Sequence, residues 1–399
     1  MKAPPIMHDL VIRFGNEYGP EEEEAVIQVL RRGAPTSDVA CRKFEEEFAS
    51  YCGARYARTV TNGTAALFLS LLGVGVGKGD RVLTTPLTWI ATAASAVTLG
   101  AEVDFVDIDP VTYNMDPGKL EDKMRGGAKA VIPVHLYGQC CDMDPVLEMS
   151  ARLGFKVIED ACHAIGAEYK GRKAGNLGHA GCFSFHEQKN ISTLGEGGMV
   201  VTNDPDTFER VSLYRSHCTR VYGPSLKYCQ IDESRFPMGK RFWYQDFDDA
   251  GYNFRMTDIQ AAVGIVQLAK LDRFNRRRID NAAYLSGKLA GIKGLVLPKI
   301  MHGNTHVFHL YPVLIQSDEF GMEKEDFVHA MLHQKGIKVG THYTPIHLSE
   351  AFRKRGFCKG QFPVAESVAD RLVTLPVNPR QTREALDYLV ESVAGLAGK

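Results

Sequence analysis

Short apolar runs alternate with helix-like stretches between about residues 60 and 205 of the chain. The helix-like stretches include Thr64–Leu72 and Trp89–Leu99. The apolar runs are rich in β-branched residues, which favour strands: Arg81–Thr85, Val103–Asp107, Ala130–His135, Lys156–Asp160, Cys182–Phe185 and Met199–Thr202. This alternation predicts an α/β fold in which helices flank a mostly parallel sheet.

A different pattern begins at Thr257. Apolar residues at helical spacing predict a long amphipathic helix over Asp258–Leu289, with a break along its length. The run Arg276–Arg278 on this helix is expected to form a solvated face.

The remaining C-terminal residues combine strand and helix signals. A strand over Val307–Leu314, a helix over Lys324–Gln334 and a final helix from Thr382 predict a smaller α+β unit. We therefore expect two domains, a large one over residues 1–256 and a small one over residues 257–399. The large domain also contains an N-terminal helix that begins at Pro20 and carries acidic residues in its first turn.

The composition is that of an ordinary globular protein, and its charge balance does not favour binding to a polyanion. The 399 residues include 47 Lys and Arg and 48 Asp and Glu, so the formal net charge is −1. Neither nucleic acid nor a membrane is therefore an expected partner. The N-terminus has no apolar signal region and no window approaches a membrane span, so a cytoplasmic location is expected. The nine cysteines do not indicate a disulfide framework, and Cys162 and Cys182 are expected to be buried thiols.

Two segments with small residues are candidates for an anion site. The glycine-rich stretch Gly73–Asp80 follows a predicted helix and precedes a strand, the reverse of a phosphate loop, so a helix end and turn is expected there. At Asn62–Ala65 small residues instead open a helix, whose free N–H groups can bind an anion. A Thr or Asn cap without any ligand explains this segment better when it is considered alone.

A carboxylate and a lysine supply two further candidate groups. Asp160 ends an apolar strand at the sheet edge where parallel sheets bind ligands, and Glu159 must face the opposite way. Strand-end carboxylates are also often held in caps or salt bridges. Lys189 lies between an apolar strand and a glycine-rich turn, where partial loss of solvation would lower its pKa and favour imine formation.

These three features are together what pyridoxal 5′-phosphate (PLP) requires. The cofactor needs a lysine for its aldehyde, a site for its phosphate and a carboxylate that keeps its pyridine nitrogen protonated. A metal site is not predicted. His329 and His333 are four residues apart on a predicted helix, but the sequence offers no third ligand, so we expect an exposed pair.

The sequence resembles the DegT/DnrJ/StrS family of sugar aminotransferases, which are PLP-dependent enzymes of the aspartate-aminotransferase fold (fold type I). The resemblance covers nearly the whole chain and includes Lys189 and the segments Thr61–Ala65, Pro86–Ala93, Val106–Pro110, Pro133–Gly138, Glu159–His163, Phe183–Phe185, Gly195–Gly198, Gly251–Met256 and His342–His347.

The resemblance also implies roles for individual residues. It makes Lys189 the catalytic, Schiff-base lysine, Asp160 the partner of the pyridine nitrogen and His163 a neighbour of the phenolic oxygen. The remaining cofactor contacts that it implies are the stacking residue Trp89, the phosphate site at Asn62, Gly63, Thr64, Ala65 and Ser184, and Asn253, which would reach the phosphate of the partner in a homodimer. The substrate residues that it implies are His347, Tyr343 and Arg255, although His347 and Tyr343 could equally have packing roles.

This chain departs from the family at two places. Cys218 stands where the family commonly has Gly, and the stretch between His217 and Gly251 is long, basic and aromatic. That stretch could bind a nucleotide diphosphate or form an interface.

The sequence thus predicts an aminotransferase that moves an amino group from glutamate or glutamine to a keto-sugar, expected to be nucleotide-linked. Three alternatives are a keto-cyclitol acceptor, a pyridoxamine-dependent dehydratase and a catalytically silent partner subunit. The dehydratases have His in place of Lys189, and the retained site residues disfavour a silent subunit.

Overall fold

The computed structural model describes residues 17–33, 36, 39–221 and 245–398. In these ranges, no helix has both the length and the apolar character that a membrane crossing requires.

A seven-stranded sheet forms the centre of the large domain, in the order β1-β9-β8-β5-β4-β2-β3. Its strands are β1 (Tyr56–Val60), β2 (Arg81–Thr84), β3 (Glu102–Phe105), β4 (Ala130–Ile132), β5 (Lys156–Asp160), β8 (Ala180–Ser184) and β9 (Gly198–Thr202). The pairs from β8 to β3 are parallel, whereas β9 is antiparallel to both neighbours. Six strands therefore share one direction and present their carboxyl ends at one edge, as the predicted mostly parallel sheet requires.

Helices cover both faces of this sheet because successive strand residues point to opposite sides. Val157 belongs to one core and Ile158 to the other. One face is covered by α4 (Gly63–Gly73), α5 (Ala91–Thr98) and α8 (Pro205–Arg215). The other is covered by α3 (Val39–Cys52), α6 (Pro117–Met124), α7 (Met143–Leu153) and part of α9 (Asp258–Leu289).

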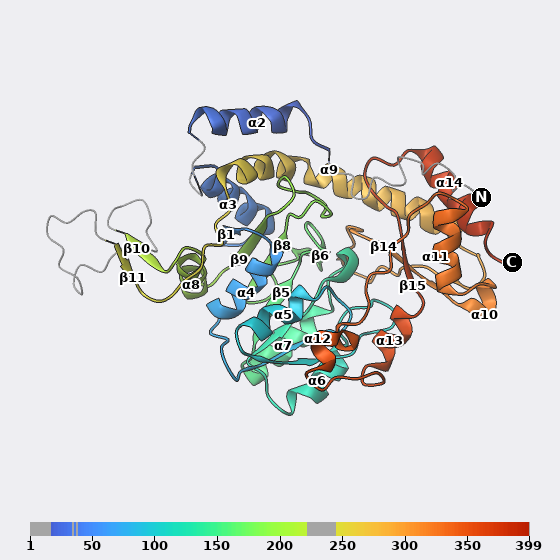
Figure 1. Ribbon diagram of the computed structural model, residues 1–399, viewed down its shortest axis with the longest axis horizontal. Coiled ribbons are helices and arrows are strands. Elements are labelled where there is room, and N and C mark those ends of the chain that lie inside the picture. The colour runs from blue at the N-terminus through green and yellow to red at the C-terminus, as the bar shows by residue number, and fades with distance from the viewer. Residues whose placement is uncertain (1–16, 34–35, 37–38, 222–244, 399) are drawn as a thin grey trace.

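The helix α9 joins the two parts of the molecule. A capping box of Thr257 and Gln260 begins it, and its first half packs in the core of the large domain. Its last turns pack with the C-terminal core. In Figure 1 it runs along α2 (Pro20–Arg31) and reaches α14 (Arg383–Ala394). The predicted break is wrong, since α9 is one helix of 32 residues. The domain boundary near residue 256 stays a prediction.

The predicted solvated arginine face is also partly wrong. Arg278 is 1% exposed, and its Nη1 donates to the carbonyl oxygens of Val377 at 3.0 Å and Phe308 at 3.4 Å. Arg276 and Arg277 are exposed, as predicted. A run of like charges cannot indicate that one member turns inward to bind carbonyl groups of another segment.

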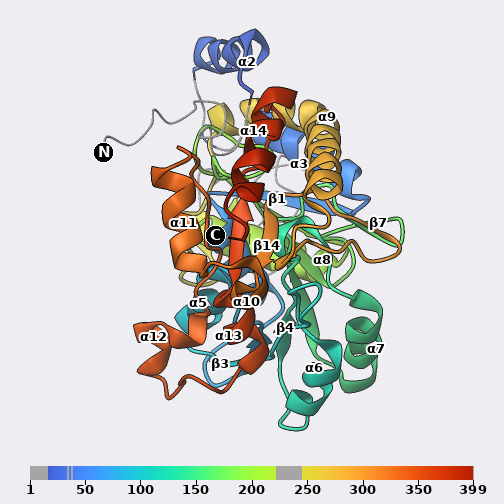
Figure 2. The ribbon, with the colours of Figure 1, turned by 90° about the vertical axis from the view of Figure 1, so that its right-hand side faces the viewer.

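The C-terminal residues form a smaller α+β unit, as predicted. Its antiparallel sheet contains β12 (Leu295–Val296), β14 (Tyr311–Ile315) and β15 (Leu372–Leu375). Figure 2 shows α11 (Lys324–His333) and α14 beside β14. The shorter elements of this unit are α10 (Ser317–Phe320), η2 (Ile346–Leu348), α12 (Glu350–Arg353) and α13 (Pro363–Ala369). The last three pack against the large domain, where Phe352 and Phe362 contact Phe105 at the β3 edge.

Small elements complete the fold: η1 (Leu136–Gly138), β6 (Glu168–Tyr169) with β7 (Arg172–Lys173) and β13 (Asn304–Thr305), and β10 (Thr219–Val221) with β11 (Gln245–Phe247). One predicted strand begins later than expected. Phe308 has a φ of 43°, and residues 307 and 310 bond to the η1 backbone, so the strand over Val307–Leu314 starts only at Tyr311. The expected helix over Trp89–Leu99 likewise starts at Ala91.

The glycine-rich segment after α4 is a helix end and turn, as predicted. Gly75 and Gly79 have φ values of 84°, which glycine adopts readily, and the segment ends at β2.

Candidate active site

A pocket of about 590 Å³ opens at the edge where the parallel strands end. Its lining residues include ones at or just after the carboxyl ends of β1, β4, β5 and β8, and others in the segment that follows β2. Nine of the predicted site residues line it: Asn62, Gly63, Thr64, Trp89, Asp160, His163, Ser184, Lys189 and Tyr343. Residues from five separate segments of the sequence therefore meet where open parallel sheets bind ligands.

The N-terminus of α4 forms one side of the pocket. Asn62 is the N-cap, and its side chain accepts the Ala65 N–H at 2.9 Å, so the capping interpretation is correct for this residue. The N–H groups of Gly63 and Thr64, in the first turn, have no intrahelical acceptor and remain for an anion. A Cβ on Gly63 would lie 2.8 Å from Cβ of Ser184 and 2.9 Å from Sγ of Cys162. Glycine is therefore needed for α4 to approach the end of β8 this closely.

Lys189 lies in the turn between β8 and β9. Its side chain is half-buried, and burial lowers the pKa of Lys189 below its ordinary value, against the opposing effect of Cys162, Asp160 and Glu196. Within the described ranges no acceptor binds Nζ. The amine is thus open to the pocket, and its lowered pKa favours the neutral, nucleophilic form.

The glycines that follow Lys189 are required by close backbone contacts. A Cβ on Gly197 would lie 2.0 Å from Oγ1 of Thr193, and one on Gly198 would lie 2.4 Å from the Asn62 carbonyl oxygen. The turn that carries Lys189 therefore packs directly on the residue that caps α4.

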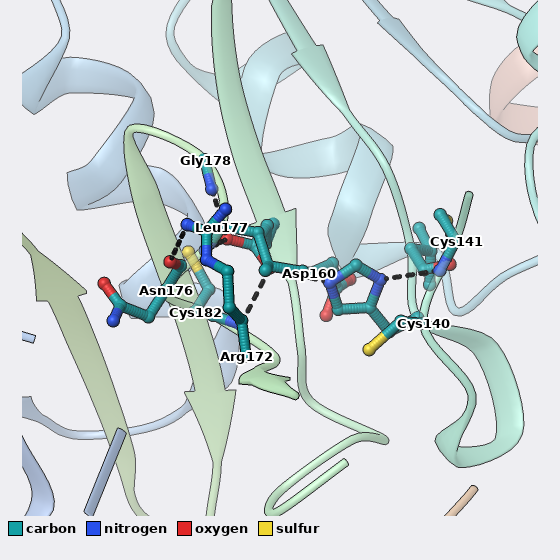
Figure 3. A network of polar contacts seen from close by, with 12 residues as sticks. Cys140, Cys141, Asp160, Arg172, Asn176, Leu177, Gly178 and Cys182 are labelled. Carbon is teal, nitrogen blue, oxygen red and sulfur yellow. Dashed lines mark hydrogen bonds and ion pairs between the residues drawn. The ribbon is translucent and has the colours of Figure 1, made fainter. Parts of the chain in front are cut away.

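Glu159 and Asp160 face opposite ways, as predicted. Asp160 lines the pocket and accepts bonds from Thr92 Oγ1 at 2.7 Å and from the Cys162 N–H at 3.2 Å. Glu159 is fully buried on the other side. It accepts the N–H groups of Gly175, Leu177 and Gly178, and lies 2.8 Å from His135 Nε2. Figure 3 shows Leu177 and Gly178 on one side of this network and Cys141 on the other. Glu159 thus has a structural role and fixes the end of β5.

A cluster of aromatic and histidine residues lines another part of the pocket. Tyr343 OH lies 3.2 Å from His163 Nε2, and the Tyr343 ring is 5.9 Å from Trp89. Burial lowers the pKa of His163 well below its ordinary value, with a further contribution from Lys189, so its imidazole is neutral at pH 7. Burial raises the pKa of Tyr343, which keeps its hydroxyl protonated. Trp89 is 60% exposed and offers an open ring face at the pocket.

Four predicted site residues lie elsewhere. Ala65 is buried inside α4, and its N–H is taken by the cap. Asn253 is exposed, and Arg255 donates to Ser216 Oγ at 3.0 Å. His347 is buried and lies 2.9 Å from Glu366 Oε1. This chain alone therefore does not bring Asn253, Arg255 or His347 into the pocket.

Several pocket residues were not among the predicted site residues: Thr88, Thr92, Cys162, His186, Gln188, Glu196 and His342. His309 was not predicted either, although its ring lies 4.3 Å from that of His163. Thr92 had a usable signal. It stands four residues after Thr88, which is the spacing of neighbours on one helix face, and the segment follows the end of a strand, where ligands bind. His342 also had one, since it begins the segment His342–His347 that carries the family resemblance. His309 had none, because only the fold brings it beside His163, more than 140 positions away.

The structure also locates the cysteines and the histidine pair singled out in the sequence. The cysteines in the described part of the chain are all free thiols. Cys182 is buried, as predicted, but Cys162 is half-buried and lines the pocket. Burial raises the pKa of both thiols, so neither is a ready nucleophile. His329 and His333 are an exposed pair with ring centroids 5.6 Å apart, and the described residues contain no cluster fit for a metal ion.

The described parts of the two departures from the family pattern adjoin the paired strands β10 and β11. Cys218 has a φ of 53° and His217 of 60°, so the turn forms without glycine. Arg220 pairs with Asp248 at 2.6 Å and Glu209 at 3.1 Å, so acidic neighbours already bind this guanidinium. Seven further basic and aromatic residues of this stretch lie outside the described residues: Tyr222, Lys227, Arg235, Lys240, Arg241, Trp243 and Tyr244.

Comparisons with known proteins agree with this geometry. GDP-perosamine synthase of Caulobacter vibrioides is 37% identical over 352 residues, 88% of each chain. The dTDP-3-amino-3,4,6-trideoxy-alpha-D-glucose transaminase of Streptomyces venezuelae is 35% identical over 379 residues, 94% of this chain and 92% of that protein. The solved structure of S. venezuelae DesV in complex with a ketimine intermediate superposes with a TM-score of 0.84 at 33% identity, and the match covers 95% of both chains.

These likenesses confirm the predicted fold, that of the PLP-dependent aminotransferases of fold type I. The sequence profile of the DegT/DnrJ/EryC1/StrS aminotransferase family matches residues 16–394. The chain therefore belongs to the DegT/DnrJ/EryC1/StrS aminotransferase family.

Proposed function

We propose that this protein is a PLP-dependent aminotransferase that moves an amino group from glutamate or glutamine to a nucleotide-linked keto-sugar. The observation that carries the proposal is one pocket in which an open lysine amine, a carboxylate and a helix N-terminus meet. A silent partner subunit would have no need for a half-buried lysine with a lowered pKa.

The residues of the pocket fit the cofactor in number and kind. Lys189 would hold its aldehyde carbon, Asp160 its pyridine nitrogen and His163 its phenolic oxygen. The free N–H groups at the start of α4, with the Ser184 hydroxyl, would hold its phosphate, and Trp89 would cover its ring. The bound cofactor supplies an electron sink for cleavage of the Cα–H bond of the amino acid.

The protein groups around this sink have separate tasks. Lys189 Nζ, in its neutral form, would move the proton from Cα of the donor to the former aldehyde carbon of the cofactor, and would carry out the reverse transfer toward the acceptor carbon. Asp160 would keep a positive charge on the pyridine nitrogen, because a carboxylate in a partly dry site stabilises a neighbouring cation. Neutral His163 acts as a hydrogen-bonding group and adds no competing charge.

The acceptor is proposed from the relatives. The names of two of them, GDP-perosamine synthase and dTDP-3-amino-3,4,6-trideoxy-alpha-D-glucose transaminase, contain nucleotide-linked amino sugars. We also propose a homodimer in which Asn253 completes the phosphate site of the partner, because this exposed side chain has no place in its own pocket.

The test is reconstitution of the purified protein with PLP, followed by addition of L-glutamate or L-glutamine. Release of the corresponding 2-oxo acid measures the first half-reaction. A panel of nucleotide-linked keto-sugars, with keto-cyclitols beside them, then identifies the acceptor that regains an amino group. A protein that binds PLP but releases no 2-oxo acid from any donor would contradict the proposal, with Lys189→Ala as the reference for background release.

A further inference from the structure

Two threonines lie in line behind the carboxylate of Asp160. Thr92 Oγ1 donates to Asp160 Oδ2 at 2.7 Å, and Thr88 Oγ1 lies 3.2 Å from Thr92 Oγ1. Thr88 is 3% exposed and Thr92 is 0% exposed, yet both border the pocket. The second carboxylate oxygen, Oδ1, accepts the Cys162 N–H at 3.2 Å. Each oxygen of Asp160 therefore has one donor of its own.

The direction of these hydrogen bonds follows from the number of protons. An ionised carboxylate only accepts, so the single proton of the Thr92 hydroxyl is committed to Asp160. Thr92 can then only accept from Thr88, which makes Thr88 the donor of that pair. The order Thr88 to Thr92 to Asp160 directs two hydroxyl dipoles toward the charge, and hydrogen bonds to a charged acceptor are the strong ones.

A comparison within α5 shows that this contact is not an ordinary feature of its hydroxyl residues. Ser95 Oγ donates to the Ala91 carbonyl at 2.7 Å, and Thr98 Oγ1 donates to the Ala94 carbonyl at 2.9 Å. Both are the usual bonds to the residue four positions earlier in the same helix. Thr92 instead reaches Asp160, 68 positions away in the sequence, from the first turn of α5. A helix N-terminus also favours a nearby negative charge.

We propose that Thr92 is the positioning residue of Asp160: its hydroxyl holds the carboxylate in the orientation that pairs with a pyridine nitrogen. This inference rests on the proposed function, because it assigns Asp160 to the ring nitrogen of PLP. A carboxylate accepts up to about four hydrogen bonds, so its two described donors leave room for that pairing. Thr92 itself does not need to touch the cofactor.

The test measures cofactor affinity rather than turnover. Equilibrium dialysis of cofactor-free protein gives the dissociation constants of PLP and of the analogue in which carbon replaces the ring nitrogen. Their ratio isolates the pairing of Asp160 with the nitrogen. Thr92→Val keeps the shape and removes the hydroxyl, whereas Thr92→Ser keeps the hydroxyl. Thr98→Val, at an exposed residue of the same helix, is the matched control.

We expect wild type to prefer PLP, and Thr92→Val to reduce this preference about tenfold, the value of roughly one charge-assisted hydrogen bond. Thr92→Ser and Thr98→Val should keep the preference to within about twofold. An unchanged ratio in Thr92→Val overturns the inference, as does an equal loss in Thr92→Ser, since the methyl group would then be responsible. If Thr92→Val does not fold, Thr92→Ala is judged by the same criterion.

Failure of the proposed role of Asp160 would already be visible in the wild-type protein. A wild-type protein that binds PLP no better than the carbon analogue contradicts the role of Asp160 itself, and the inference falls with it. A clear wild-type preference that Thr92→Val retains contradicts only the role of Thr92.

Discussion

The imidazole of His347 and the carboxylate of Glu366 form a buried pair with 2.9 Å between Nε2 and Oε1. Glu366 also accepts the N–H groups of Gly360 and Phe362. The pair ties η2 to α13, and η2 directly follows the segment that brings His342 and Tyr343 to the pocket. His347 therefore supports the pocket through the chain that carries Tyr343, without lining it.

This arrangement predicts the effect of His347→Ala. Glu366 would lose one partner in a buried place, so the free energy of unfolding should fall by about 1–3 kcal/mol. Urea denaturation measures the loss. Glu366→Gln keeps a neutral hydrogen bond and should cost less. A His347→Ala protein of unchanged stability that no longer binds the sugar would instead point to a direct contact with substrate.

Lys189→Ala should abolish the release of 2-oxo acid from glutamate, with a loss of at least about 10²-fold, because the variant has no amine to move the proton. The fold should be unaffected, since Lys189 lies in a turn and its amine has no acceptor in the described part of the chain. Lys189→Arg, which keeps the charge but cannot become neutral, should be as inactive as Lys189→Ala. An arginine variant with near-wild-type release would refute the role of a neutral amine.

Gly63→Ala should weaken PLP binding and the fold together. The added Cβ would lie 2.8 Å from Ser184 and 2.9 Å from Cys162, so α4 must move away from the end of β8. Overpacking of this kind costs about 1–3 kcal/mol. Gly77→Ala is the matched control, because a Cβ there would meet nothing within 4 Å. Equal melting temperatures and PLP affinities for the two variants would contradict the close approach.

The sequence predicted the site best where a single short segment contained both a recognisable strand, helix start or turn and the functional side chain on it. The strand Lys156–Asp160 and its terminal carboxylate were readable together, because an apolar run fixes the strand and alternation fixes which residue faces the pocket. The same holds for Asn62 at the start of α4 and for Lys189 before its glycines.

What the sequence could not give depends on contacts between distant segments. Strand β1 was missed because its residues Tyr56–Val60 include polar side chains that its partner β9 and helix α3 partly cover. The burial of Arg278 depends on carbonyl groups at Phe308 and Val377. The positive φ of Phe308, which delays the start of β14, depends on packing against η1.

Acidification should destabilise the protein through its buried histidines, and His306 allows a clean test. Burial lowers the pKa of His306 from 6.5 to about 3. Between these two values the unfolded chain binds one more proton at this residue than the native chain. Stability therefore falls as the pH is lowered from about 6.5 toward 3, by up to about 1.4 kcal/mol per pH unit for this group.

The variant His306→Gln should remove that contribution. Only the slope of stability against pH is compared, because the bond that His306 Nδ1 accepts from the Phe308 N–H at 3.0 Å is lost with the imidazole. Urea denaturation at several values between pH 4 and 6 gives the slope of stability against pH, and this slope should be smaller in His306→Gln than in wild type. His329→Gln, at an exposed histidine, is the control. Identical slopes for wild type and His306→Gln would show that His306 is not held neutral.

The proposed homodimer predicts that two inactive variants can complement each other. Asn253 is exposed, and the backbone of its segment bonds to Tyr214 and Arg215, which fixes it away from its own pocket. If Asn253 reaches the phosphate of the partner subunit, Asn253→Asp should impair each homodimer, because the added carboxylate repels the phosphate at close range. Lys189→Ala should be inactive for a separate reason.

In a heterodimer of Lys189→Ala with Asn253→Asp, one site collects both changes. The other site combines an intact Lys189 with an intact Asn253 from the neighbouring subunit. Activity should therefore return on subunit exchange. About half of the active sites in the heterodimers should be functional, because one of the two sites in each is intact. The measurement is 2-oxo acid release from mixtures whose heterodimers are demonstrated by two affinity tags. If such heterodimers stay as inactive as the parents, while Asn253→Asp alone is impaired, then Asn253 does not act across the interface.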